Sequence, residues 1–282
     1  METSLIILGS GQDGGTPQLG LPQSVSHPRL ASSIAVVAKS GAVILFDASP
    51  DIRVQSHLLI NSSIYPDDRE VWLDGVFITH AHMGHYSGLV HFGPESSNAD
   101  GVPLFATESV LSFLGTNEPW HSLFANDHLI AVPLDNSTAS IDNEVSVTPI
   151  HVPHRDEFSD TVAFSVHVDG EPWLLYLPDI DGWDEWPEAS EVLEEHDVAL
   201  IDASFSDPSE LPGRDLAAIR HPLVPDTIAT FSNLAGDMRI ILTHINHTNP
   251  LGDPTEAITR LALEADFEIA HDGMIVTRGI RP

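Results

Sequence analysis

Three histidines lie within six residues of one another, at His80, His82 and His85. The apolar residues 76–78 before them are typical of the end of a buried strand, and residues 86–90 could form a first helical turn. A loop between the two would bring several imidazole nitrogens to a common centre, which suits a tetrahedral or five-coordinate divalent metal. The alternative is a chance cluster of hydrogen-bonded histidines. We predict a metal site.

Other apolar stretches of the chain also end in a histidine or an aspartate. In chain order these residues are Asp47, His154, Asp179, Asp202 and His244. A single aspartate after a strand is most often a turn or cap residue. Active sites of layered α/β proteins, however, collect where the loops after several strands converge. The repetition therefore predicts that these side chains share one site.

The elements that would position these residues are short strands and a few helices, separated by glycine and proline. Paired apolar runs predict three hairpins. They join residues 33–38 with 42–46, 161–168 with 173–177, and 267–270 with 274–277. Helices are predicted over residues 52–60, 107–114, 190–196 and 255–264.

The stretch 9–17 is too rich in glycine to be regular. It could cradle a phosphate through backbone N–H groups, but it lacks the Lys-Ser/Thr of a P-loop. We expect instead a tight turn that brings the backbone close to the active centre.

Composition limits the chemistry that is available. The chain has 282 residues, 42% of them apolar, which is enough to bury a substantial core. It has no cysteine, so any metal must be held by histidine and carboxylates. The absence of disulfides fits a cytoplasmic protein. The first residues are typical of a strand rather than a signal peptide, and no apolar run approaches the roughly 20 residues that span a bilayer.

The charge balance is strongly acidic. The chain has 42 Asp and Glu against 11 Lys and Arg, a formal net charge of −31, and Lys39 is its only lysine. Binding to nucleic acid or to an anionic membrane is therefore disfavoured, and a small-molecule substrate is expected. Such a surface suggests salt tolerance, or else reflects genome composition. Neither a monomer nor a homodimer is excluded.

The order of these residues resembles the metallo-β-lactamase superfamily over nearly the whole chain. The matching residues are Asp47, the motif His80-x-His82-x-x-His85, His154, Asp179 and His244. Within the superfamily, residues 48–53, 106–111 and 244–250 resemble the coenzyme PQQ synthesis protein B group. The resemblance implies an α/β fold, a four-layer αββα sandwich with a metal site in a groove at one edge. It also implies a single domain, residues 1–282, built from two similar halves of about 1–140 and 141–282.

Two departures from the superfamily pattern affect the expected metal content. Gly84 stands where the motif normally carries an aspartate that helps to hold a second metal, and the cysteine cluster of the PQQ group is absent. We therefore predict closer to one bound metal than two, and expect Gly84→Asp to raise occupancy of the second position. The alternative is that another residue, such as His247 or Asp181, compensates.

We assign roles to the candidate residues as follows. The first metal is expected on His80, His82 and His154, with one position left open. Asp179 would bridge to a weaker second position formed with His85 and His244, and these three residues are the catalytic candidates. Asp47 is expected to orient an imidazole without touching the metal. The candidates for substrate contact are Arg155, His247 and His221.

These roles predict a metal-dependent hydrolase. Zinc is the expected metal, as one or two ions, with iron and manganese as alternatives. A hydroxide formed on the metal would attack an ester, lactone or phosphodiester of a small molecule, with a neighbouring carboxylate or histidine handling protons. The PQQ resemblance implies an alternative, an iron-dependent oxygenase in quinone cofactor maturation. Gly84 suggests a third hypothesis, a non-catalytic small-molecule binding or carrier protein.

Overall fold

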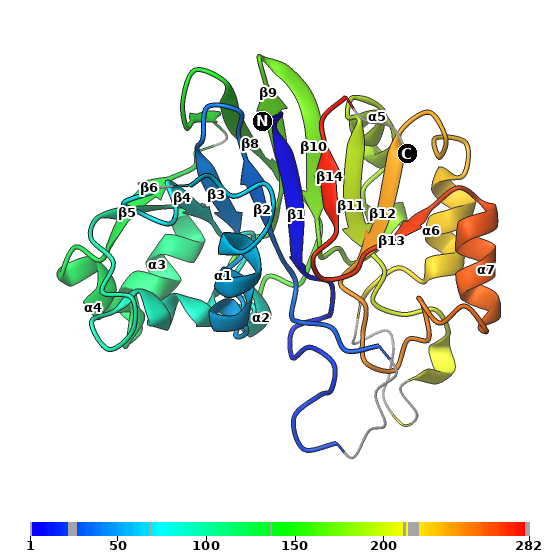
Figure 1. Cartoon of the computed structure of the whole chain (residues 1–282). Helices are drawn as coiled ribbons and strands as arrows, with labels where there is room; N and C mark the ends of the chain where they lie inside the picture. The colour runs from blue at the N-terminus through cyan, green and yellow to red at the C-terminus, as the bar shows by residue number, and fades with distance from the viewer. Residues whose placement is uncertain are drawn as a thin grey trace.

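Two seven-stranded β-sheets pack face to face, and helices cover the outer surface of each sheet (Figure 1). The computed structural model describes residues 2–21, 27–67, 69–135, 137–210, 213 and 220–279. Three groups of buried apolar side chains hold the layers together, one between the sheets and one between each sheet and its helices. The predicted α/β class with four αββα layers is therefore confirmed.

The first sheet comes mostly from the amino-terminal half of the chain, and its strands stand in the order β14-β1-β2-β3-β4-β5-β6. Their bounds are β1 Ser4–Gly9, β2 Ser33–Val37, β3 Val43–Phe46, β4 Gly75–Phe77, β5 Val102–Ala106, β6 Leu129–Pro133 and β14 Ile275–Thr277. The helices of this half are α1 Ile52–Ile60, α2 Met83–Tyr86, the 3-10 helix η1 Ser87–Phe92, α3 Glu108–Thr116 and α4 Trp120–Ala125.

The second sheet has the strand order β13-β12-β11-β10-β9-β8-β7. Its strands are β7 Ala139–Ser140, β8 Val145–His151, β9 Val162–Val168, β10 Glu171–Leu177, β11 Val198–Asp202, β12 Arg239–Thr243 and β13 Glu268–Ile269. Its helices are η2 Trp183–Glu185, α5 Ala189–Glu194, η3 Pro208–Glu210, α6 Val224–Phe231 and α7 Ala257–Glu264. Among the described helices, none is long and apolar enough to cross a membrane.

Strand β1 shows how the sequence specifies the layers. Side chains alternate between the two faces of a strand, so Leu5 and Ile7 enter the core between the sheets while Ile6 and Leu8 pack against the helices. Both faces of β1 are therefore buried. This explains why the strand is an uninterrupted apolar run rather than an alternating one.

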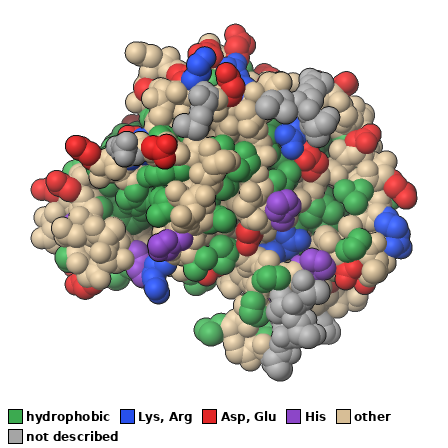
Figure 2. Space-filling model, in the orientation of Figure 1, with side chains coloured by type: hydrophobic (Ala, Val, Ile, Leu, Met, Phe, Trp, Pro, Cys, Tyr) green, Lys and Arg blue, Asp and Glu red, His purple; other side chains and the backbone are tan. Residues whose placement is uncertain are grey.

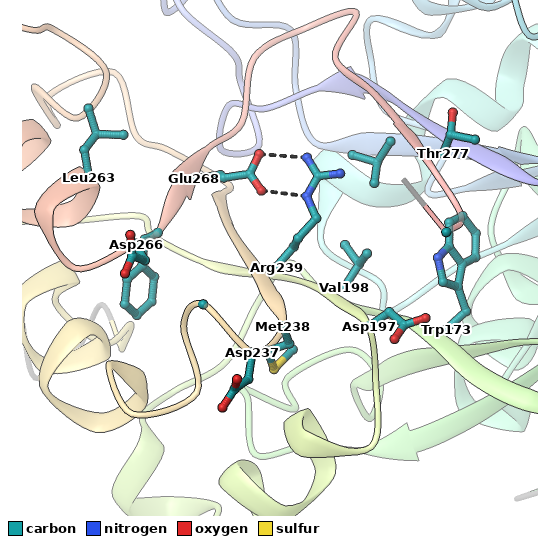
Figure 3. Close-up of a pocket in the computed structure, with 14 residues that line it drawn as sticks. Trp173, Asp197, Val198, Asp237, Met238, Arg239, Leu263, Asp266, Glu268 and Thr277 are labelled. Carbon is teal, nitrogen blue, oxygen red and sulfur yellow. Dashed lines mark hydrogen bonds and ion pairs between the residues drawn. The ribbon is translucent and has the colours of Figure 1, made fainter. Parts of the chain in front are cut away.

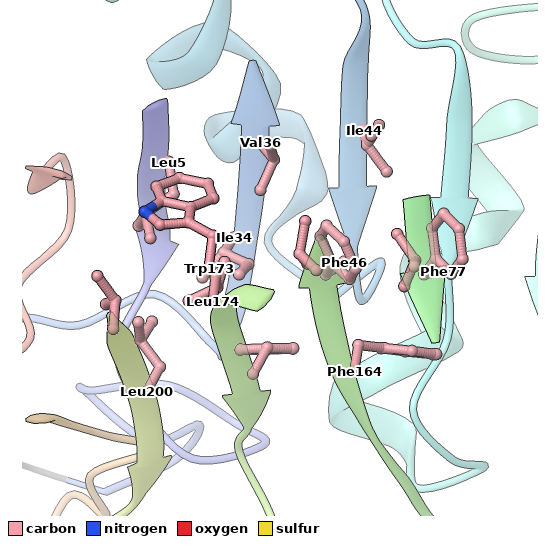
Figure 4. Packing of buried hydrophobic residues seen from close by; sticks show 14 of the residues in the cluster. Leu5, Ile34, Val36, Ile44, Phe46, Phe77, Phe164, Trp173, Leu174 and Leu200 are labelled. Atoms are coloured by element: carbon pink, nitrogen blue, oxygen red, sulfur yellow. The ribbon is translucent and has the colours of Figure 1, made fainter. Parts of the chain in front are cut away.

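Aromatic rings fill the core between the sheets, where Phe46 and Phe77 of the first sheet meet Phe164 of the second (Figure 4). The ring of Phe77 is fully buried, and its centroid lies 4.5 Å from that of Phe105, 5.2 Å from Phe46 and 5.3 Å from Phe164. Removing this ring would leave a cavity bordered by side chains of both sheets.

We expect Phe77→Ala to lower the free energy of unfolding by about 3–5 kcal/mol, because the substitution loses both apolar burial and packing contacts. Urea denaturation of the metal-free protein measures this loss. The matched control is Phe158→Ala, since the Phe158 side chain is 55% exposed and should contribute much less. Equal losses in the two variants would mean that the Phe77 ring does not stabilise the packing of the two sheets.

Two of the three predicted hairpins form, β2 with β3 and β9 with β10, both antiparallel. The third prediction, a hairpin from residues 267–270 and 274–277, is wrong. Strand β13 pairs in parallel with β12, and β14 pairs antiparallel with β1 in the other sheet. The turn between them crosses from one sheet to the other. It is anchored there by Asp272, whose carboxylate accepts hydrogen bonds from the backbone N–H groups of Ser10 and Leu30.

Candidate metal centre

The strand directions bring the candidate residues to one edge of the sandwich. Strands β10, β11 and β12 are parallel, and β8 runs with them because both β8 and β10 are antiparallel to β9. The carboxyl ends of these strands therefore meet at the same edge. From there project His154 after β8, Asp179 after β10, Asp202 at the end of β11 and His244 after β12. The loop and short helix after β4 bring the three clustered histidines to the same place.

Four of these side chains form a first ligand group, which we define as His80, His82, His154 and Asp179. His82 Nδ1 lies 2.9 Å from His80 Nε2 and 3.2 Å from His154 Nε2. The Asp179 carboxylate lies 3.4 Å from His80 Nε2 through Oδ2 and 3.4 Å from His154 Nε2 through Oδ1. Metal–ligand bonds of about 2.1 Å place neighbouring donors of a tetrahedron about 3.4 Å apart. These separations therefore fit one divalent ion.

A second ligand group, Asp13, His85 and His244, adjoins the first. His85 Nε2 lies 3.4 Å from Asp179 Oδ2 and 3.7 Å from Asp13 Oδ1. His244 Nε2 lies 3.5 Å from Asp179 Oδ2. Because Asp179 is within reach of both groups, one carboxylate can serve two neighbouring ions.

Several buried polar atoms in these groups have no hydrogen-bond partner in the described part of the chain. They are Asp13 Oδ1, His85 Nε2, Asp179 Oδ1 and His244 Nε2. Buried polar atoms are normally paired, and the ligand atoms of Asp13, His85 and His244 lie within 4.8 Å of one another. A divalent cation would satisfy all of them, and a set of imidazole nitrogens and carboxylate oxygens suits zinc, manganese or iron. The residues therefore fit a metal.

The protonation states of the first ligand group agree with metal binding. Burial lowers the pKa of His82 to about 4 and that of His80 well below its usual value, so both imidazoles are in the neutral, metal-binding form. Burial alone would raise the pKa of Asp179, but His154 and His244 outweigh it and hold the pKa well below its usual value. Asp179 is therefore an ionised oxygen donor.

Residues behind the ligands orient them. Asp47 Oδ2 lies 2.8 Å from His85 Nδ1, and the same carboxylate accepts a hydrogen bond from the Thr79 backbone N–H. Asp181 Oδ1 lies 2.9 Å from His154 Nδ1, and Ser204 Oγ lies 3.0 Å from His244 Nδ1. At His85 and His244, a proton shared at Nδ1 leaves the Nε2 lone pair free to bind metal.

His221, a candidate for substrate contact, lies inside the centre together with Asp202. Both belong to a third set of potential ligands, which also includes Asp179 and His244. His221 Nδ1 is 2.7 Å from Asp202 Oδ2 and 3.3 Å from Asp179 Oδ1. Burial alone would lower the pKa of His221, but Asp202 and then Asp179 raise it to about 9. The distance of 2.7 Å is that of a strong hydrogen bond, so His221 and Asp202 are a hydrogen-bonded pair beside the first two ligand groups.

Arg155 and His247 lie outside these groups of potential ligands. The Arg155 side chain is 35% exposed, with Nη1 3.7 Å from Glu157 Oε1. His247 Nδ1 lies 2.6 Å from the side-chain oxygen of Asn246. Asp181 is the other residue expected to replace the carboxylate that Gly84 lacks. Its carboxylate instead lies beside His154 Nδ1, on the side of the ring that faces away from the metal ligands.

Two carboxylates of the centre, Asp13 and Asp202, have no ligand or catalytic role predicted from sequence. Asp202 does end a strand, like the other site residues, but a lone carboxylate there is more often a cap. Asp13 lies in a glycine-rich loop that matches no metal motif. Gly84 is the feature of the sequence that could have pointed to Asp13. A histidine motif without its usual aspartate leaves room for a carboxylate from another part of the chain.

A separate hollow lies at the opposite ends of the strands, around the amino-terminal residues of β11 and β12 (Figure 3). Arg239 and Glu268 form a two-pronged ion pair there, with N–O distances of 2.6 and 2.8 Å. None of the ligand histidines lines this hollow, so the shape of the surface does not by itself identify the candidate metal centre. On the face shown in Figure 2, most carboxylates lie towards the edge, and a few separate histidines lie across the middle.

Comparisons with known proteins agree with the fold. A family model described as the beta-lactamase superfamily domain matches residues 43–245. The chain is 26% identical to a coenzyme PQQ synthesis protein B of Methylococcus capsulatus, covering 95% of this chain and 97% of the relative. The solved structure of Zn(2+)-bound PqqB from Methylobacterium extorquens has a TM-score of 0.77 at 23% identity, covering 97% of this chain and 99% of that one. A diphosphatase from the PhnP family has a TM-score of 0.71 at 23% identity, covering 98% and 97%.

Proposed function

Because this chain belongs to the beta-lactamase superfamily, we propose that it is a metal-dependent hydrolase of a small ester, lactone or phosphodiester. The observation that supports this most strongly is the position of Asp179, within 3.5 Å of nitrogens in both ligand groups. Two adjacent ions that share a carboxylate are suited to displacement at phosphorus or at a carbonyl carbon. The phosphorus substrate is favoured among the three, because one neighbour of the same fold is named a diphosphatase, which also acts at phosphorus.

Each residue of the centre would have a separate role in the reaction. A divalent cation here supplies Lewis acidity, which polarises the electrophile and makes water a better nucleophile at neutral pH. Asp179 fixes the spacing of the two groups, and Asp47 holds His85 in its orientation. As water adds to the electrophile, the bond to the leaving oxygen breaks and that oxygen takes a proton. His221 would deliver this proton from Nε2, while its Nδ1 keeps its own proton in the hydrogen bond to the Asp202 carboxylate.

The substrate would be a small anion, bound with help from the few cations of this acidic chain. Arg220 Nη1 lies 3.4 Å from Asp181, and Arg155 is close enough to affect the pKa of His82. An arginine is well suited to a phosphate or carboxylate, since its planar fork donates two parallel hydrogen bonds. We assign Arg155 and His247 to this substrate side of the centre.

We expect metal-free protein, after addition of Zn²⁺ or Mn²⁺, to hydrolyse bis(p-nitrophenyl) phosphate, and a chelator to abolish the activity. Release of nitrophenolate measures the rate, and elemental analysis of protein purified without added metal gives the native content. The same assay on a p-nitrophenyl ester and on a lactone separates the three substrate classes. Tightly bound metal without turnover in any of the three assays would favour the binding-protein hypothesis instead.

A second candidate, an iron-dependent oxygenase in quinone cofactor maturation, is favoured by relatives named coenzyme PQQ synthesis protein B that match this chain over 95–97% of its length. The histidine and carboxylate ligands also suit Fe²⁺. Oxygen consumption by the iron-loaded protein with a quinone precursor, and no hydrolysis with Zn²⁺ or Mn²⁺, would support this candidate over hydrolysis.

A further inference from the structure

Gly84 faces a side chain that arrives from a distant part of the sequence. A Cβ atom built at Gly84 would lie 2.3 Å from Asp13 Oδ1, 2.5 Å from Asp13 Cα and 3.1 Å from Asp13 Cβ. Two of these distances are shorter than real Cβ contacts, and one of them involves backbone. Any side chain at position 84 would therefore occupy the space that Asp13 fills.

The Asp13 carboxylate is directed at the second ligand group. Asp13 Oδ1 is buried, accepts no hydrogen bond from the described residues and lies 3.7 Å from His85 Nε2. Together with His244 Nε2, these atoms all lie within 4.8 Å of one another. A buried polar oxygen without a hydrogen-bond partner is energetically unfavourable, and a cation at this position would remove that cost.

The backbone fixes Asp13 relative to the ligand opposite it. The N–H of Gln12 donates to the carbonyl of Ile245, and the N–H of Ile245 donates to the carbonyl of Ser10. Ile245 directly follows His244, so these two hydrogen bonds tie the loop before Asp13 to the backbone of a ligand. The N–H of Gly15 closes a turn onto the carbonyl of Gln12, with a positive φ of 66° that favours glycine.

We propose that Asp13 takes the place of the missing side chain at position 84 and holds a second divalent cation together with His85, His244 and Asp179. This rests on the proposed function only in requiring a metal at the first ligand group. This proposal replaces two expectations from the sequence, namely that the protein binds closer to one metal than two and that Gly84→Asp raises occupancy of the second position. Gly84→Asp alone should now weaken the second position, because its side chain collides with Asp13.

The test removes the carboxylate at position 13, or adds one at position 84, and measures how many metal ions bind. Titration of metal-free protein with Zn²⁺, followed by calorimetry and elemental analysis, should give two equivalents for the unmutated protein. Asp13→Gly and Gly84→Asp should each weaken the second equivalent at least about 10-fold, by analogy with the losses caused by removing residues that only support ligands. The double variant Asp13→Gly/Gly84→Asp should not regain the second equivalent, because the Cα atom of residue 13 would still lie 2.5 Å from a Cβ atom at position 84. Asp13→Asn, which keeps the shape of the side chain, should behave like Asp13→Gly.

Controls make the same changes away from the centre. Asp184→Gly removes the charge of an exposed side chain in the 3-10 helix η2, and Gly115→Asp adds one where a Cβ meets open space. Both should keep two equivalents. Retention of two equivalents in Asp13→Gly and Asp13→Asn would overturn the inference. One equivalent in every variant would overturn it while leaving a one-metal hydrolase intact. No binding in the unmutated protein would remove the proposed function as well.

Discussion

Asp179→Ala should remove metal from both ligand groups and lower kcat/KM by more than about 100-fold. The Asp179 carboxylate is 2% exposed and lies 3.4 Å from His80 Nε2, 3.4 Å from His85 Nε2 and 3.5 Å from His244 Nε2. Loss of a residue that only supports a ligand commonly costs 10–100-fold in metal affinity or activity. Loss of Asp179, a ligand shared by both groups, should lower metal affinity and activity by a larger factor. Elemental analysis and phosphodiester turnover measure the two effects.

His82→Ala provides the comparison, because His82 belongs to the first ligand group alone. It should remove one equivalent and leave the second. Both variants should keep their far-ultraviolet circular dichroism, because three separate apolar cores stabilise the fold. Full metal content in Asp179→Ala, or equal losses in the two variants, would mean that Asp179 is not the carboxylate that joins the groups.

The ligands that could be predicted from sequence are those that end or follow a local apolar run. His80, His82 and Asp179 are examples, since a strand and its final loop lie within a few residues of one another. The four-layer fold could be predicted for a related reason. In β1, every residue of the run is buried on one face or the other, and this pattern is visible in the sequence itself.

What could not be predicted depends on pairing between distant segments. Strand β14 joins β1 across nearly the whole chain, although a tight turn next to β13 made a hairpin the simpler interpretation. Asp13 reaches the centre because its loop is bound to the backbone after His244. No local pattern records that contact. The only sign of it in the sequence is the glycine at position 84. This glycine shows that the motif lacks its carboxylate, but it does not identify the residue that supplies one instead.

His221→Gln should lower kcat for a phosphodiester with an alkoxide leaving group by about 10²–10⁴-fold, the usual contribution of a positioned acid or base. Glutamine keeps the size and a hydrogen bond to Asp202, but it cannot transfer a proton. A p-nitrophenolate leaving group departs at neutral pH without protonation. Turnover of bis(p-nitrophenyl) phosphate should therefore fall far less. The ratio of the two rates measures the role of His221 as an acid.

Metal content separates this role from that of a ligand. His221 Nδ1 lies 3.3 Å from Asp179 Oδ1, so the imidazole could instead turn and bind metal. In that case His221→Gln would lose metal, and both substrates would be affected equally. Asp202→Asn is the second variant, because it weakens the 2.7 Å hydrogen bond that holds the His221 ring. If His221 acts as an acid positioned by Asp202, this variant should show the same preference for the nitrophenyl substrate, to a smaller extent and with both metals still bound.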